Sequence, residues 1–126
     1  MAWWSWQAKG LICGCWLVAA VAAAAPPGAI TPIHHIQGAG PASPLVGRTV
    51  TTRGIVTAVF PGLRGWFLQD ESGDGDPRTS DGVFVFANRG PIDVAVGERI
   101  ELTATVTEYA ARAGEPTLTE LVRPSV

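Results

Sequence analysis

The chain has 126 residues, with 9 Lys and Arg against 11 Asp and Glu, and a formal net charge of −2. This length leaves room for one domain at most. The acidic balance argues against a dedicated DNA-binding domain, which is usually strongly basic.

The first 25 residues have the pattern of a secretory signal peptide. Lys9 supplies a positive charge, and the apolar run LICGCWLVAAVAAAA follows it and ends in small residues before PPG. This order is typical of an exported leader. A membrane anchor is the alternative, but a spanning helix needs about 20 apolar residues. A lipoprotein site at Cys15 is weaker because the apolar run continues beyond it. We therefore expect residues 1–25 to be removed from a secreted protein, extracellular or periplasmic, without a membrane segment.

The expected mature chain, residues 26–126, loses the single lysine and both cysteines with the leader. It keeps eight Arg against eleven Asp and Glu, a formal charge of −3, and it must fold without a disulfide. Residues 26–43 are rich in Pro, Gly and Ala, which predicts an extended lead-in. His34 and His35 would point to opposite sides of such a chain. They would make a poor metal pair, so we expect both to be solvated.

Five segments are typical of β-strands, and no window has helical periodicity. The first contains Gly54, and a glycine inside a strand marks a bulge or a sharp coil. The fourth has the clearest alternation of apolar and polar residues. In chain order the segments are TVTTRGIVTAVF (49–60), WFLQD (66–70), GVFVFA (82–87), ERIELTATVTEY (98–109) and TLTELV (117–122).

This strand count predicts an all-β fold. Five strands, a coiled first strand and about 100 residues favour a five-stranded OB-fold-like Greek-key barrel over residues 44–126. Such barrels often carry a helix between strands three and four, but residues 87–97 are too short and too broken by Gly and Pro for more than one turn. An open β-sandwich is the alternative.

Four stretches together resemble a known bacterial module. They are IHHIQGAGPASPLVG, TVTTRGIVTAVF, GWFLQDESGDGDPRTSDGVFVF and VAVGERIELTATVTEY. The chain resembles, over about residues 33–122, the OB-fold-like domain that precedes the catalytic domain in secreted nucleases of the endonuclease/exonuclease/phosphatase superfamily. In that family, metal-dependent phosphodiester cleavage belongs to a larger downstream domain, for which there is no room after Tyr109. The resemblance thus implies a fold and a setting but no catalytic residue, and we expect no enzyme activity from this chain by itself.

The segment DESGDGDPRTSD, residues 70–81, is close to the calcium loop of EF-hands. Hard Ca²⁺ takes six to eight oxygen ligands, and alternate residues of a tight loop converge on one point. Ser at position three, Asp at position twelve and Pro77 at position eight depart from the EF-hand pattern. There are two alternatives to calcium binding. Asp and Gly simply form turns, or the acidic residues keep an exposed hairpin tip soluble. The candidate ligands of a structural Ca²⁺ are Asp70, Ser72, Asp74, Asp76 and Asp81.

OB-folds bind nucleic acid on strands two and three, between the loops that join strands one to two and four to five. Aromatic rings stack there on bases, and arginines meet phosphates. Alternation places Phe67 with Gln69 on the outer face and Trp66 in the core. Core packing is the competing interpretation for each aromatic residue, and the acidic balance weakens phosphate binding. The candidate nucleic-acid-binding residues are Arg64, Phe67, Phe84, Phe86, Arg89, Tyr109 and Arg112.

These observations predict a monomeric, non-catalytic module that binds nucleic acid without sequence specificity, as the accessory part of a secreted nuclease. Its other expected partner is a nuclease catalytic domain. The alternative is a calcium-stabilised extracellular interaction or spacer module that binds protein or polysaccharide.

Overall fold

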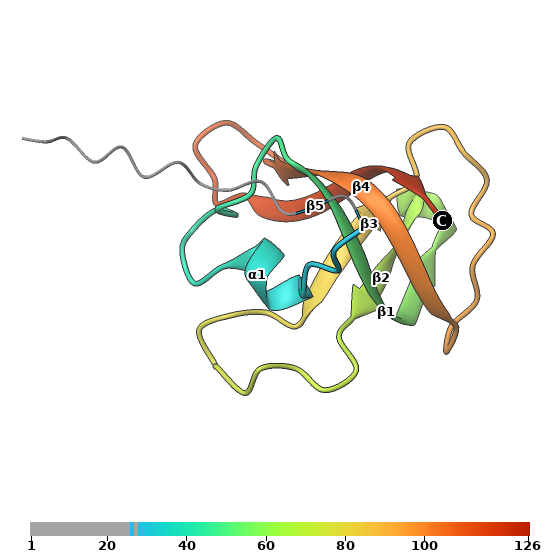
Figure 1. The fold of residues 1–126 in the computed structure, drawn as a ribbon. Helices are drawn as coiled ribbons and strands as arrows, with labels where there is room; N and C mark the ends of the chain where they lie inside the picture. Colours follow the sequence, from blue (N-terminus) through green and yellow to red (C-terminus); the bar gives the residue numbers. More distant parts are fainter. Residues whose placement is uncertain (1–25, 27) are drawn as a thin grey trace, which may run out of the picture.

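The computed structural model describes residue 26 and residues 28–126, so the predicted signal peptide lies outside the described residues. The described part forms five strands and two short helices (Figure 1). The helices are α1, Ile33–Gln37, and the single 3₁₀ turn η1, Pro61–Leu63. The strands are β1 (Thr49–Phe60), β2 (Gly65–Gln69), β3 (Gly82–Phe86), β4 (Arg99–Tyr109) and β5 (Leu118–Ser125).

The strands close into a barrel in the order β1-β2-β3-β5-β4. β3 and β5 pair in parallel, and the other neighbours pair antiparallel. The predicted all-β, five-stranded barrel is confirmed, and the sandwich alternative is excluded because β4 returns to β1. The connection from β3 to β4 contains no helix.

β1 is long enough to belong to both sides of the barrel. Its first half, Thr49–Ile55, pairs with β4, and its second half pairs with β2 from Ile55 onward. At Gly54, where the partner changes, an added Cβ would collide with the backbone carbonyl of Gln69. Only glycine allows this close approach of two strands. The predicted sharp coil is therefore present, and the register shift lies just beyond it, between Val56 and Ala58.

The core is built by alternation along each strand. Trp66 and Leu68 of β2, and Val83 and Val85 of β3, point inward and are buried. Trp66 is 2% exposed, whereas Phe67 beside it is 41% exposed. The predicted core position of Trp66 and outer position of Phe67 are confirmed. β4 contributes the inward row Ile100, Leu102, Ala104 and Val106.

The prediction of an extended lead-in is wrong at Ile33–Gln37. These residues form helix α1, which packs beside the barrel (Figure 1), and Ile33 and Ile36 are fully buried in its core. A spacing of three residues puts both isoleucines on one helix face. The side-chain amide of Gln37 also donates a hydrogen bond to the Gly82 carbonyl at 2.6 Å. This part of the lead-in thus belongs to the barrel domain.

Among the described residues, no helix is long and apolar enough to cross a membrane.

Candidate ligand groove and acidic loop

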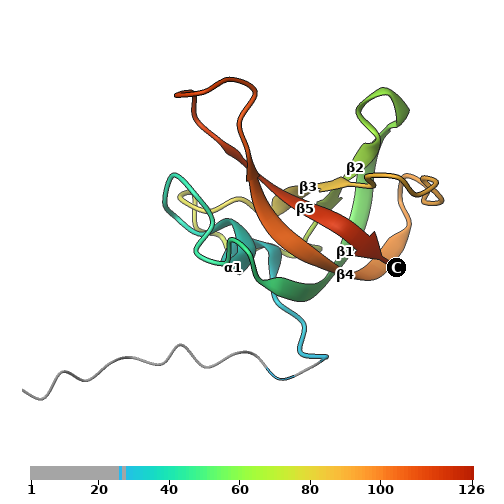
Figure 2. The same ribbon diagram turned by 90° about the horizontal axis from the view of Figure 1, so that it is seen from above.

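A groove of about 810 Å³ runs over the outer face of β2, β3 and β5. Figure 2 shows that the β1–β2 and β4–β5 connections rise on the same side of the barrel, so they stand on either side of these strands. The β2–β3 connection and the segment after α1 complete the walls. Lining residues include Gly38, Leu63, Phe67, Arg78, Ser80, Phe84, Phe86, Tyr109, Leu118 and Glu120.

Aromatic rings form the surface of this groove. Phe67 and Phe84 are direct neighbours across β2 and β3, and their ring centroids lie 5.2 Å apart in an edge-to-face arrangement. Phe60 extends the row, 6.0 Å from Phe67. Tyr109, at the end of β4, is 51% exposed. Phe60 and Phe67 are exposed and Phe84 is half-buried, so the outer face of the barrel carries a cluster of apolar rings, a feature typical of interaction sites.

The structure brings the four predicted aromatic residues together but not the three predicted arginines. Phe67, Phe84, Phe86 and Tyr109 all line the groove. The three arginines do not belong to the groove lining. The Arg64 carbonyl accepts a hydrogen bond from the Ala87 amide at 2.8 Å, so the β1–β2 connection contacts the end of β3, two residues before Arg89. In the β4–β5 connection, Arg112 lies 3.5 Å from Glu115.

Sequence reasoning missed several groove residues. Leu63 and Leu118 are exposed leucines in the walls of the groove. A single leucine carries no sequence signal that tells whether its side chain is buried or exposed. Arg78 and Glu120 are the charged lining residues. Arg78 donates hydrogen bonds to Asp76, 2.7 Å at the closest, and this pairing raises the pKa of Arg78 and lowers that of Asp76. Partial burial raises the pKa of the Glu120 carboxyl.

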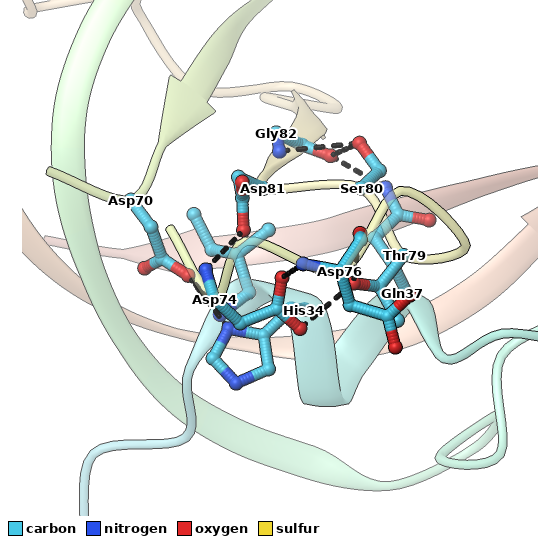
Figure 3. A network of polar contacts seen from close by, with 10 residues as sticks. His34, Gln37, Asp70, Asp74, Asp76, Thr79, Ser80, Asp81 and Gly82 are labelled. Carbon is cyan, nitrogen blue, oxygen red and sulfur yellow. Dashed lines mark hydrogen bonds and ion pairs between the residues drawn. The ribbon is translucent and has the colours of Figure 1, made fainter. Parts of the chain in front are cut away.

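The middle of the acidic loop is held by its own hydrogen bonds (Figure 3). The Asp76 amide donates to Asp74 Oδ1 at 2.9 Å, and the Thr79 hydroxyl donates to Asp74 Oδ2 at 2.8 Å. These two bonds, the amide first, lower the pKa of Asp74. Ser72 lines a separate cavity next to Asp70. Such contacts are typical of Asp in turns.

The two ends of the loop meet at α1. The Asp70 amide donates to the Asp81 carbonyl at 2.8 Å, and Asp70 Oδ2 accepts a hydrogen bond from the Ile33 amide at 3.0 Å. His34 Nδ1 lies 3.4 Å from the same Asp70 oxygen. Ligand atoms of His34, Asp70 and Asp81 all lie within 4.8 Å of one another (Figure 3).

Two of the five predicted calcium ligands therefore converge, together with a histidine. Asp74 and Asp76 do not belong to this cluster. Calcium binding by the five residues stays a prediction. The expectation that His34 is solvated is wrong, because its side chain is only 19% exposed. The cause is α1, which turns His34 toward Asp70, whereas His35 faces solvent as expected.

No protein-family model, curated protein sequence or solved structure matches this chain.

Proposed function

We propose that this protein is a secreted, monomeric, non-catalytic module that holds an unpaired nucleic-acid strand in its groove for a nuclease catalytic domain. The observation that carries the proposal is the row of aromatic side chains on the outer face of β2 and β3, where Phe67 is exposed and Phe84 and Phe86 are half-buried. OB barrels bind oligonucleotides on that face, between the two loops that flank this groove.

The chemistry of the groove favours bases as ligands. Base–aromatic stacking tolerates any sequence, since every base has a flat π-face. Phe67 and Tyr109 expose their rings, and the edge-to-face contact with Phe84 fixes the orientation of Phe67. Only unstacked bases can reach such rings, so a single strand fits better than a duplex.

The arginines fit a secondary role in the connections around the groove. Arg64 lies in the β1–β2 connection, Arg89 follows β3, and Arg112 lies in the β4–β5 connection. Because so few arginines can contact phosphates, we expect the affinity for nucleic acid to depend only weakly on salt concentration. The nuclease setting rests on the resemblance over residues 33–122.

The test is fluorescence anisotropy with a short labelled single-stranded oligonucleotide of mixed sequence. Phe67→Ala and Tyr109→Ala should each weaken binding by about 1–3 kcal/mol, the usual value of one stacked base. Val96→Ala is the control, because this exposed valine lies in the β3–β4 connection and outside the groove lining. Equal affinity of all four proteins, or a preference for duplex, would contradict the proposal.

One observation favours a neutral polymer, such as a polysaccharide, as the second candidate ligand. Arg78, the arginine in the groove lining, is already paired with Asp76. The groove has aromatic rings but little unpaired positive charge, so its rings can stack on the apolar faces of sugars as well as on bases. If polysaccharide binds, and Phe67→Ala abolishes it while no oligonucleotide binds, the second candidate replaces the first.

A further inference from the structure

We propose that His34, Asp70 and Asp81 form a binding site for a first-row divalent transition metal, such as Mn²⁺ or Zn²⁺. The site would fasten α1 to both ends of the β2–β3 connection. It shares Asp70 and Asp81 with the predicted calcium loop but adds His34 and takes a different metal, and it does not depend on the function of the groove.

The geometry suits one ion. Metal bonds to histidine nitrogen and carboxylate oxygen are about 2.1 Å, so two ligand atoms at a tetrahedral angle lie about 3.4 Å apart. His34 Nδ1 and Asp70 Oδ2 are 3.4 Å apart. All three ligand atoms lie within 4.8 Å of one another. Two ligand atoms of one ion can lie at most about 4.2 Å apart, which is twice the bond length. Small side-chain rotations would bring the two most distant ligand atoms within this limit.

The nitrogen of His34 needs a partner. Nδ1 is shielded from solvent and makes no hydrogen bond with the described part of the chain. Its 3.4 Å separation from Asp70 Oδ2 exceeds the usual N–H···O range of about 2.7–3.2 Å. A cation bound between Nδ1 and the Asp70 carboxylate would give both groups a partner.

The surrounding bonds hold the carboxylates in place. The Ile33 amide donates to Asp70 Oδ2 at 3.0 Å, and the Asp74 amide donates to Asp81 Oδ1 at 3.2 Å. Outer hydrogen bonds of this kind orient metal ligands and stabilise their positions. Within the described part of the chain no hydrogen bond to the second oxygen of Asp81 is present, so this oxygen is available for an ion.

The mixture of ligands selects the metal. Imidazole with carboxylate suits Zn²⁺ and its neighbours in the first row, and carboxylate also suits Mn²⁺. Ca²⁺ prefers oxygen ligands alone. A cavity of about 490 Å³ beside His34 and Asp70 gives solvent access, so water can fill the remaining coordination positions. Arg53 and Arg99 also line this cavity, and Arg99 is neutralised by a 2.6 Å bond to Glu71.

The test is metal titration of the purified protein by calorimetry and by electron paramagnetic resonance, with Mn²⁺ as the main probe. In the full chain, which keeps the leader, the thiolates of Cys13 and Cys15 would also bind Zn²⁺, so Zn²⁺ serves as a competitor only. We expect one Mn²⁺ per chain. His34→Ala and Asp81→Asn should weaken binding at least tenfold. The matched controls, His35→Ala and Asp76→Asn, should leave it unchanged.

A second readout needs no variant. Bound Mn²⁺ should broaden the imidazole proton resonances of His34 before those of His35. Three results would overturn the site. The first is no Mn²⁺ binding, which leaves His34 and Asp70 as a direct pair. The second is binding that His34→Ala retains. The third is Ca²⁺ binding that Asp76→Asn removes and His34→Ala does not, which would restore the five-residue calcium loop.

Discussion

The groove depends on a residue that has no side chain. Gly65 begins β2 and lies opposite Phe86 of β3. A Cβ at this position would collide with the Val85 carbonyl and with the ring of Phe84. The absent side chain lets the Phe84 ring lie over β2, where it meets Phe67 edge to face. The position of the half-buried Phe84 ring in the aromatic row thus depends on Gly65.

Gly65→Ala should destabilise the fold by about 1–3 kcal/mol, because an added methyl group in a packed site forces its neighbours to move. Chemical denaturation measures the change. Gly62→Ala is the matched control, since nothing lies within 4 Å of a Cβ built at Gly62, and it should change stability by less than about 0.5 kcal/mol. Equal stability of both variants would mean that Phe84 does not occupy the space above Gly65.

At the scale of elements, the short helix α1 connects the core, the acidic loop and β3. Its two isoleucines belong to the core, and its first amide and His34 both face Asp70. Gln37 fixes its other end to β3. Through these contacts α1 supports the long β2–β3 connection, which supplies Arg78 and Ser80 to the groove.

Ile36→Ala should destabilise the protein by about 2–5 kcal/mol, the usual cost of a cavity left by a large buried side chain. His35→Ala, on the exposed side of the same helix, should have an effect below about 0.5 kcal/mol. Both are measured by urea unfolding. A loss below about 1 kcal/mol for Ile36→Ala would show that α1 is not part of the cooperative core.

The strands were predictable from sequence, and α1 was not. The alternation over β4 and the glycine in β1 are local signals, which predict strands without knowledge of tertiary contacts. The helix spans five residues, too few for a helical period, and its burial depends on contacts with β3 distant in sequence. For the same reason His34 could not be associated with Asp70 and Asp81 from spacing alone. The outer position of Phe67 followed from alternation. The buried face of β3 could not be predicted, and the absence of the three arginines from the groove lining depends on loop conformation.

At the scale of the whole molecule, the barrel closure explains why distant segments share one surface. Parallel pairing of β3 with β5 sets Leu118 and Glu120 beside the aromatic row of β2 and β3. The formal net charge of −2 provides no long-range attraction for a polyanion. Ligand recognition in our account therefore depends on contact with rings rather than on the field of the protein.

The most direct measurement is an NMR titration of the ¹⁵N-labelled protein with a short single-stranded oligonucleotide. We predict shifts concentrated in the amides around Phe67, Phe84 and Tyr109 and in the two flanking connections, with the β1–β4 face unchanged. No shifts at all, or shifts centred on the opposite face of the barrel, would contradict the claim that the aromatic groove binds nucleic acid.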